Sequence, residues 1–582
     1  MQLVDYTTFT ALGRELRTEW LPARAEQVYQ RDRYTIALGL RTLEKRGWLT
    51  ISWHPQAARL CLGDAPPRIP DTFTFSDQLR HQLGGLALVE MMAIAPWERV
   101  LDLQFARRPG DPILWHLYVE IMGKYSNLIL ADAQNQIVTA AHQVSSQQSS
   151  VRPIQTGQPY ELPPALNDPI PNLSELRQRW QERISLIPGR LGKQLLRNYR
   201  GLSSSLVNAM ILAACLDPNQ STDSLNDQDW QQLFEHWQAW LKVLAGEKEW
   251  QPAETETGYT VLGWGAIQTK TTISDLVNTY YNAELDRQDF AQLRHQLSQK
   301  LNNILQKLRL KAQTFATRLQ QSDGADEYRQ QADLLMAHLQ DYQPGMKAIA
   351  LTDFHTNNLV TIPLEPEKNA IQNAQALYKR HQKLKRSRAA VEPLWQQVQA
   401  EIEYLEQVEL TLAQIDTYRT AQDLQALIEI REELIQQQYL DAPAQRHHPT
   451  VDTSTPHRYR TPSGFELLIG RNNRQNDQLA FRTAGDYDLW FHAQEIPGGH
   501  GLLRLPPGAV AETADLQFTA DLMAFYSRAR QSDSVPVVYT EPKHVYKPKG
   551  AKPGIAVYKH ERILWGRPQQ AETTIGKILN LN

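Results

Sequence analysis

Two clusters of lysine and arginine are the residues whose type and spacing most clearly suit a binding role in this sequence. The ligand that such clusters suit is phosphate. The first cluster contains Lys379, Arg380, Lys383, Lys385, Arg386 and Arg388. No aspartate or glutamate occurs between residues 371 and 390. Contact with nucleic-acid phosphates is one interpretation, since each neutralised phosphate releases counterions. A solvated helix surface beside an acidic partner protein is the other.

The second cluster lies on a turn-rich segment, residues 543–554, with the sequence KHVYKPKGAKPG. Its lysines, Lys543, Lys547, Lys549 and Lys552, alternate with tyrosine, histidine, proline and glycine. Such a loop can lay ammonium groups and an aromatic face along an RNA strand. A merely solvated loop is the alternative.

A third polar segment, residues 470–477, has the sequence GRNNRQND. Asparagine and glycine tolerate tight turns, so a plain hairpin is one interpretation. The density of amides with two arginines also suits hydrogen bonds to phosphates or base edges.

Catalytic motifs are missing from the sequence, which contains no GxxxxGK[ST], HExxH or GxSxG. The sixteen histidines are dispersed, and the adjacent pair His447 and His448 falls in a predicted linker where we expect it to be solvated. Two cysteines, Cys61 and Cys215, are too few for a disulfide framework or a cysteine-based zinc site. We therefore expect no catalytic residue, no cofactor and no metal.

The composition indicates several ordered domains. The chain has 582 residues, which predicts about three to five domains at roughly 100–200 residues each. Its net charge of −3 excludes a uniformly basic nucleic-acid binder, and 41% hydrophobic residues favour globular structure. Residues 1–17 lack a signal-peptide core, and no run of about 18 apolar residues occurs, so we expect a cytoplasmic protein without a membrane span.

The elements that must position these residues fall into successive segments. Residues 1–170 predict a mixed α/β unit with strands at 34–40, 49–53, 99–105, 115–121 and 128–131 and a helix at 75–92. Residues 171–275 predict a helical region, with Gly201 at the C′ position of one helix and Ser203 as the N-cap of the next. That turn is either a phosphate-binding helix–hairpin–helix or an ordinary connection between two helices.

Two apolar seams at three- and four-residue steps, within 283–320 and 370–436, predict an antiparallel coiled-coil arm over residues 276–440. An insert at about 322–370 carries strand-like pieces at 346–352 and 359–363, and a solvated helical bundle is the alternative to the arm. A linker at 441–456 leads to an α/β unit at 457–568, with strands at 466–469, 489–492 and 535–539 and a helix near 512–530. Residues 569–582 form a C-terminal tail.

Several motifs point to one family. They are EIMGKYSN at 120–127, GFELLIGRNN at 464–473, Asn476-Asp477, DLWFHA at 488–493, Pro497-Gly498 and GAKPG at 550–554. Together they resemble the RqcH/NEMF family of ribosome-associated quality-control factors, the NFACT proteins formerly described as fibronectin-binding proteins, and most closely the bacterial RqcH branch.

The resemblance implies a multidomain α+β fold. Its parts are an NFACT-N domain similar to formamidopyrimidine-DNA glycosylases, a helix–hairpin–helix, a long antiparallel coiled-coil arm with a middle insert, and a C-terminal α/β NFACT-R RNA-binding module. Those glycosylases use an N-terminal proline as nucleophile, whereas here Gln2 follows Met1. Loss of that amine removes the covalent step, so the first domain is interpreted as an RNA-recognition surface.

The resemblance also implies a function. Family members bind 50S subunits that are obstructed by a stalled peptidyl-tRNA, and they recruit tRNA, probably alanyl-tRNA in this branch, for template-free C-terminal tailing of the nascent chain. The ribosome makes the peptide bonds, so the factor is an adaptor that contributes positioning rather than an enzyme. The implied partners are the 50S subunit, rRNA, tRNA and peptidyl-tRNA, with no membrane.

The family motifs and the basic clusters together give three sets of candidate residues. For tRNA they are Asp5, Glu98, Arg99, Lys124, Ser126 and Asn127, and for the ribosome they are the six cations of the first cluster. For RNA in NFACT-R they are Arg471, Asn472, Asn473, Asp477, His492, His500 and the four lysines of residues 543–552.

Two of these sites depart from the family pattern. Glu98-Arg99 replaces a family Asp-Arg pair with a side chain that is one methylene longer, and a surface salt bridge is the alternative role for it. Gly499 and Gly501 stand in PGGHG, where the family has PGSHV, and we expect them to loosen the strand start.

Two other functions remain open at this point. An adhesin that binds a fibronectin-type matrix protein would explain the older family name, although the sequence shows no signal peptide. A nucleic-acid-processing enzyme would need the nucleophile that is missing here.

Overall fold

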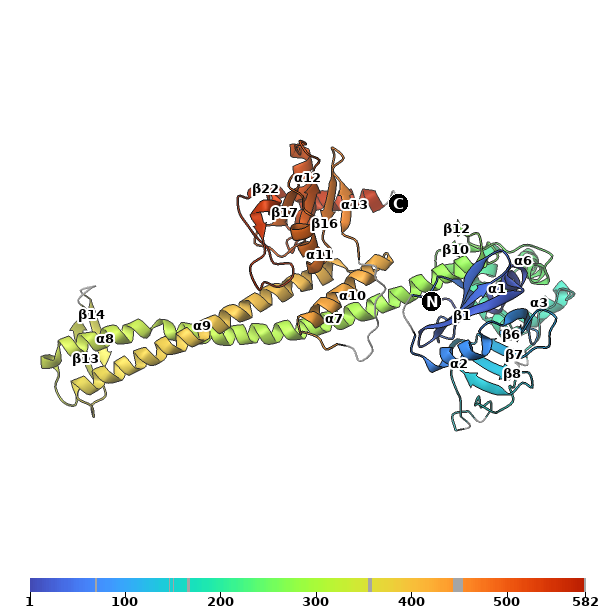
Figure 1. The fold of residues 1–582 in the computed structure, drawn as a ribbon, viewed down its shortest axis with the longest axis horizontal. Helices are drawn as coiled ribbons and strands as arrows, with labels where there is room; N and C mark the ends of the chain where they lie inside the picture. Colours follow the sequence, from blue (N-terminus) through green and yellow to red (C-terminus); the bar gives the residue numbers. More distant parts are fainter. Residues whose placement is uncertain are drawn as a thin grey trace. The chain divides into compact units, whose positions relative to one another are not determined.

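The computed structural model describes residues 1–67, 71–145, 147–149, 151–164, 168–353, 358–442 and 454–579. The chain forms two compact units, Met1–Asp286 and Arg287–Asn582, and Figure 1 labels some of their helices and strands. His447, His448 and most of the predicted linker lie outside the described residues. Among the helices of the described ranges, none is long and apolar enough to cross a membrane.

In the described part of the first unit, one antiparallel sheet has the order β4-β3-β2-β1-β5-β6-β7-β8-β9. Its strands are Ala23–Asp32 (β1), Thr35–Arg41 (β2), Arg46–Ser52 (β3), Arg59–Gly63 (β4), Ala87–Ala93 (β5), Val100–Ala106 (β6), Trp115–Glu120 (β7), Asn127–Asp132 (β8) and Ile137–Ala140 (β9). Helices Tyr6–Trp20 (α1) and Thr74–Leu83 (α2) and a 3-10 turn at Gly123–Tyr125 (η1) accompany the sheet. The five predicted strands are confirmed as β2, β3, β6, β7 and β8.

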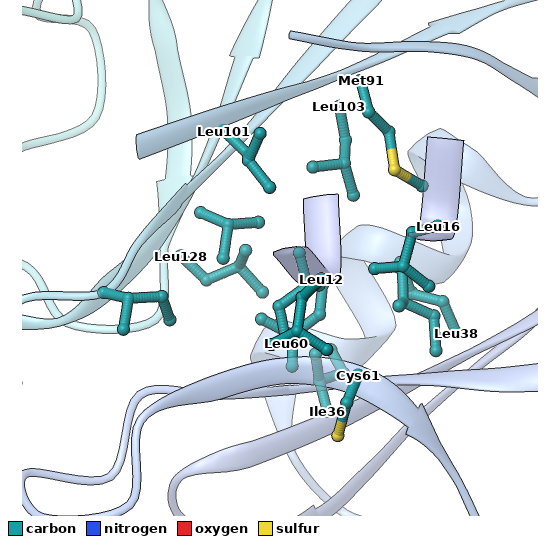
Figure 2. Close-up of a cluster of buried hydrophobic side chains, with 14 of the residues drawn as sticks. Leu12, Leu16, Ile36, Leu38, Leu60, Cys61, Met91, Leu101, Leu103 and Leu128 are labelled. Carbon is teal, nitrogen blue, oxygen red and sulfur yellow. The ribbon is translucent and has the colours of Figure 1, made fainter. Parts of the chain in front are cut away.

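Helix α1 fills the core of this unit. Leu12 and Leu16 recur at a four-residue step, and both are buried. Figure 2 shows them among side chains from both halves of the sheet, including Ile36 from β2 and Leu101 from β6. Burial of each leucine contributes roughly 1.5–3 kcal/mol, so α1 holds the two halves of the sheet together.

The predicted helix over residues 75–92 is wrong in its second half. Helix α2 ends at Leu83, Gly85 has a φ of 82°, and the following residues form β5. The pairing of β5 with β6 shifts between Leu88 and Glu90, so Leu88 and Met91 are both fully buried although they are three residues apart. This bulge gives a strand the apolar spacing of a helix.

The rest of the first unit is mainly helical. It contains Arg177–Ser185 (α3), Leu191–Asn198 (α4), Ser204–Ala213 (α5), Thr222–Ser224 (η2), Asp227–Ala245 (α6), and the small strands Ala253–Thr255 (β10), Gly258–Thr260 (β11) and Gln268–Thr269 (β12). Ser203 is the N-cap of α5, as predicted, and its Oγ accepts from the Leu206 amide at 3.0 Å. Gly201 is not the C′ residue, because Tyr199 is the C-cap of α4. A Cβ at Gly201 would lie 2.4 Å from the Trp97 ring, and this close approach requires glycine.

The second unit contains the helical arm. Its elements are Ile273–Asp323 (α7, which begins in the first unit), Ala325–Ala337 (α8), Leu339–Asp341 (η3), Ala348–Thr352 (β13), Leu359–Pro363 (β14), Ala370–Gln414 (α9) and Ala421–Gln436 (α10). Side-chain contacts join Arg294 to Ile415, Arg309 to Glu406 and Asp323 to Arg388. Because the residue numbers run in opposite directions, α7 and α9 are antiparallel, as predicted.

The helix predicted over 370–436 is two helices. Helix α9 ends at Gln414, and Thr420 begins α10 with a capping box to Asp423. Leu427 and Ile430 of α10 join the buried seam that contains Leu297 and Leu405. The three- and four-residue spacing of apolar residues continues across the break, because α9 and α10 each bury an apolar face in the same seam.

The C-terminal part of this unit is an α/β module whose antiparallel sheet has the order β15-β16-β18-β17-β19-β22. Its elements are His457–Arg460 (β15), Glu466–Ile469 (β16), Asn473–Gln478 (α11), Leu479–Thr483 (η4), Leu489–Ala493 (β17), Gly501–Arg504 (β18), Thr513–Phe525 (α12), Val535–Thr540 (β19), Pro542–His544 (η5), Val545–Tyr546 (β20), Val557–Tyr558 (β21), Arg562–Gly566 (β22) and Pro568–Leu579 (α13). The three predicted strands are confirmed as β16, β17 and β19. The hairpin considered for residues 470–477 is instead the start of α11.

Leu405→Ala should open the arm locally. Leu405 is fully buried in the seam, and truncation there should cost about 2–5 kcal/mol. Leu394→Ala on the same helix, at a side chain that is 48% exposed, should cost less than about 0.5 kcal/mol. Native-state hydrogen exchange of the α9 amides would measure both values, and equal protection in the two variants would contradict the seam.

Candidate nucleic-acid interface

Asp5 joins two helix N-termini in the first unit. Its Oδ1 accepts from the Thr8 amide at 2.8 Å and so caps α1, while its Oδ2 accepts from the Ser203 hydroxyl at 2.7 Å. Ser203 itself caps α5. Asp5 is only 6% exposed, so it fixes the angle between α1 and α5 rather than presenting a carboxylate to solvent.

Glu98 and Arg99 each have their own structural partner. Arg200, in the turn before α5, donates to the Glu98 carboxylate at 2.8 Å. Arg99 donates to the Val4 carbonyl at 3.0 Å, and burial lowers its pKa below the ordinary arginine value. The pair thus connects the start of β6 to the helical turn on one side and to the start of α1 on the other.

The turn at residues 122–127 is built by its own side chains. Ser126 Oγ accepts from the Met122 amide at 2.8 Å, and Asn127 makes hydrogen bonds to both backbone groups of His142 at 2.7–2.9 Å. Both residues are buried. Lys124 is exposed, and its ammonium lies 4.9 Å from the centroid of the exposed Tyr125 ring. Of the three predicted residues in this turn, Lys124 is therefore the one available to a ligand.

A pocket of about 670 Å³ lies where α1, α5 and the β10–β11 turn meet. Asp5, Ser204, Asn208, Tyr259 and Trp264 are among its lining residues, which include no lysine or arginine. The amide of Gln2 donates to the Tyr280 hydroxyl at 2.7 Å nearby. Leu206, Leu212 and Val261 also line it, so this pocket mixes polar and apolar groups and its lining holds no cation that would bind an anion.

The first basic cluster is exposed along α9. Arg388 pairs with Asp323, and the Arg380 guanidinium lies 4.6 Å from the centroid of the Tyr328 ring. Lys379, Lys383, Lys385 and Arg386 are exposed and form no ion pair with any described residue. The structure therefore leaves four cations of this cluster free for an anionic partner.

The residues of the GRNN segment contact α10 instead of facing solvent. Arg471 pairs with Asp423 at 3.0 Å, Asn472 donates to Glu429 at 2.6 Å, and Asn473 donates to Glu433 at 3.0 Å. Arg471, Asn472 and Asn473 thus attach the C-terminal module to α10 of the arm. The sequence signal that could have found this role is the set of carboxylates Asp423, Glu429 and Glu433 on α10, a helix whose apolar residues also belong to the buried seam.

Asp477 and the two predicted histidines organise the module internally. Asp477 accepts from the Gly554 amide at 3.0 Å and pairs with Lys547. His500 is 1% exposed, its backbone amide donates to Asn476 at 3.0 Å, and His492 hydrogen bonds to the Gly499 carbonyl. Burial lowers the pKa of both histidines, so their rings are neutral near pH 7.

The glycines that depart from the family pattern lie in tight packing. A Cβ at Gly501 would lie 2.5 Å from Met523 Sδ, and Gly501 pairs regularly with Ile469 and Phe491. The expected loosening of the strand start stays a prediction, and Met523 fills the space that a β-branched side chain would need.

The lysine loop, residues 543–554, contains two kinds of lysine. Lys543 and Lys549 are exposed, with Lys543 close to Glu541. Lys552 is half-buried, 4.6 Å from the centroid of the Tyr404 ring and 4.2 Å from that of Tyr439, and desolvation lowers its pKa. Lys552 therefore attaches the loop to the arm, whereas Lys543 and Lys549 face solvent.

A nine-stranded sheet, a helical region, an antiparallel coiled-coil arm and a C-terminal module with a basic loop define a multidomain α+β protein. Residues 5–451 match the family model described as "NFACT N-terminal and middle domains", and residues 455–559 match the one described as "NFACT protein RNA binding domain". The chain belongs to the NFACT family and carries its RNA-binding domain.

Similar proteins cover almost the whole chain. The Rqc2 homolog RqcH of Bacillus subtilis is 29% identical over 578 residues, which is 97% of each chain, and RqcH of Streptococcus suis is 29% identical over 97% of this chain and 98% of its own. A solved C-terminal part of the fibronectin/fibrinogen-binding protein of S. suis is 29% identical, with a TM-score of 0.38, over 49% of this chain and 98% of its own. The N-terminal part of that protein is 22% identical, with the same TM-score, over 48% and 98%.

Acidification should destabilise the C-terminal module. The pKa of His457 falls to about 3 in the folded state, and those of His492 and His500 are also lowered. Between their lowered folded-state pKa and the ordinary histidine pKa of about 6.5, these rings are neutral in the folded chain but take up protons in the unfolded chain. The stability they contribute is therefore complete above that pH and is lost below it, by up to about 1.4 kcal/mol per histidine per pH unit.

Calorimetric melting between about pH 7.5 and 5.5, across the ordinary histidine pKa, would measure this loss. His500→Gln should reduce the dependence on pH, whereas His295→Gln at an exposed position on α7 should not. A melting temperature that stays constant over this range would contradict the role of the buried rings.

Proposed function

We propose that this protein is a ribosome quality-control factor. In this function it binds 50S subunits obstructed by peptidyl-tRNA and recruits tRNA, in particular alanyl-tRNA, for template-free tailing of the stalled chain. The observation that carries the proposal is the match to proteins named RqcH over 97% of the chain, together with the NFACT RNA-binding domain. The site of action would be the cytoplasm, where the ribosomes are.

The arm supplies the proposed contact with the ribosome. Lys379, Lys383, Lys385 and Arg386 are exposed cations without ion-pair partners among the described residues, so no internal pair has to break before they meet phosphate. Each phosphate contact releases counterions, which makes such binding strong at low salt and weak at high salt. An otherwise nearly neutral chain can thus bind a polyanion through one defined surface.

The first unit supplies the proposed contact with tRNA. Lys124 and the exposed Tyr125 ring offer an ammonium group and a stacking face at one turn. Asp5, Glu98 and Arg99 act in this proposal through geometry, since their hydrogen bonds hold α1, α5 and the start of β6 in place. The chain contributes positioning, while the ribosome makes the peptide bond.

Affinity purification of the full chain from translating cells tests the function. We expect free 50S subunits and one enriched tRNA species to copurify, as shown by sequencing of the bound RNA. A preparation without ribosomal RNA that instead binds immobilised fibronectin would contradict the proposal and support the matrix-binding alternative.

Two triple charge-reversal variants make this test specific for the basic cluster of α9. Lys379→Glu, Lys383→Glu and Lys385→Glu together should reduce 50S binding at least tenfold and flatten its decline between about 50 and 200 mM salt. The matched control reverses Lys300, Lys307 and Lys311, three exposed lysines of α7, and should retain most of the binding. Equal losses in both triple variants would show that only net charge matters.

Glu98→Ala with Arg99→Ala should abolish tail synthesis and leave subunit binding nearly intact. The double change removes the hydrogen bonds to Arg200 and Val4, which hold α1, α5 and the start of β6 in place within the first unit. It leaves the residues of the arm unchanged. Arg107→Ala with Arg108→Ala, at exposed positions of the same unit, is the matched control. Tail length on nascent chains is the readout, and tails as long as those of the wild type would refute the positioning role.

A further inference from the structure

A second pocket, of about 640 Å³, lies in the C-terminal unit and is lined by three cations. Arg474 comes from α11, Arg482 from η4 and Lys547 from the lysine loop. Of these, only Lys547 was a candidate from the sequence. The volume of the pocket falls within the range of roughly 300–1,000 Å³ that is typical of small-molecule binding sites.

The backbone that builds this pocket is unusual. Helix α11 continues directly into η4, which is a turn of π-helix. Such turns are rare and often occur at functional sites, because the wider turn redirects its side chains. Here both Phe481 and Arg482 of the π-turn line the pocket. Gln436 at the end of α10 and Pro553 of the lysine loop also line it.

The charges in the pocket favour an anion. Arg482 is exposed and has no ion-pair partner among the described residues. The Arg474 side chain is 45% exposed and 3.3 Å from Glu432, and Lys547 pairs with Asp477. The exposed Arg474–Glu432 pair contributes only about 0–1 kcal/mol, so an incoming phosphate can replace Glu432 at little cost. The Lys547 side chain is 31% exposed and adds its positive charge to the pocket beside its partner Asp477, which also lines it.

The uncharged walls suit a base. Phe481 is half-buried, and both it and Pro553 line the pocket, so each offers apolar surface to a flat ring. Stacking of an unpaired base on an aromatic side chain contributes about 1–3 kcal/mol and tolerates any base. The amides of Gln436 and Gln478 add hydrogen-bonding groups for a base edge. A base inside a duplex is already stacked and cannot enter such a pocket.

We propose that this pocket binds one unpaired nucleotide of an RNA strand, with its phosphate against Arg474, Arg482 and Lys547 and its base on Phe481. The inference rests on the proposed function, in which this module contacts RNA, and it adds the site and the single-stranded form of the ligand. The contact of the lysine loop with α11 completes the site, because Lys547 and Pro553 belong to that loop.

Binding of the full chain to a fluorescent single-stranded hexaribonucleotide, and to the duplex of the same sequence, tests this site. Arg482→Glu should weaken single-strand binding at least tenfold. Phe481→Leu, which keeps an apolar side chain in the packing but removes the ring, should weaken it about 5- to 100-fold and change duplex binding less than twofold. The matched control is Arg458→Glu on β15, whose side chain is 67% exposed and outside the pocket, and it should bind like the wild type.

The outcomes separate this inference from the proposed function. Unchanged affinity in both pocket variants, with normal 50S copurification, overturns the pocket and leaves the function standing. A loss in Arg458→Glu equal to that in Arg482→Glu, or no effect of Phe481→Leu, also overturns the nucleotide site, as does a phosphopeptide that competes as well as RNA does. If the wild-type chain binds neither RNA nor 50S subunits, the proposed function itself is contradicted.

Discussion

Two carboxylates inside the protein, Glu429 and Glu433 of α10, organise the C-terminal half. Glu429 accepts from the Ser454 amide at 2.6 Å and from Asn472, while Glu433 accepts from the Tyr404 hydroxyl at 2.7 Å and from Asn473. Both are at most 5% exposed, and burial raises the pKa of Glu433. A buried charge is tolerated only when donors surround it, and here the donors come from α9, from the segment before β15 and from the start of α11. The same hydrogen bonds that satisfy the charges therefore fix the module on the arm.

This docking decides which basic residues can bind anything else. Arg471 and Lys552 are engaged with the arm, and Arg528 pairs with Glu406 at 2.9 Å. Other cations stay exposed and without an ion pair among the described residues, for example Lys379, Lys383, Lys385 and Arg386 of α9, Lys549 of the lysine loop and Arg482 at the π-turn. A chain with a net charge of −3 can thus still offer a cluster of unpaired cations, as it does on α9. Asp5 has a comparable role in the first unit, where one side chain satisfies the ends of two helices and in doing so sets their angle.

Local pattern was sufficient for much of the fold. Residues that favour strands, bounded by polar turns, predict β2 and β3. The three- and four-residue apolar steps predict the pairing of α7 with α9, because burial of one helix face imposes its period on the sequence. The same reasoning failed at residues 87–93, where a bulge changes which side chains share a face. It also failed at the break after Gln414, where two helices bury equivalent faces and the period runs through.

The sequence by itself determined the family, the order of the domains and the presence of the two basic clusters, since these depend only on residue types and their spacing. Only the tertiary structure decided the role of each polar residue. Asn472 and Asn473 face carboxylates about forty residues away in the chain, and Lys552 lies on a ring more than a hundred residues away. Hydrogen bonds and desolvation act through distance in space, so an amide or an ammonium group has the same sequence signature whether it meets a buried glutamate or an RNA phosphate.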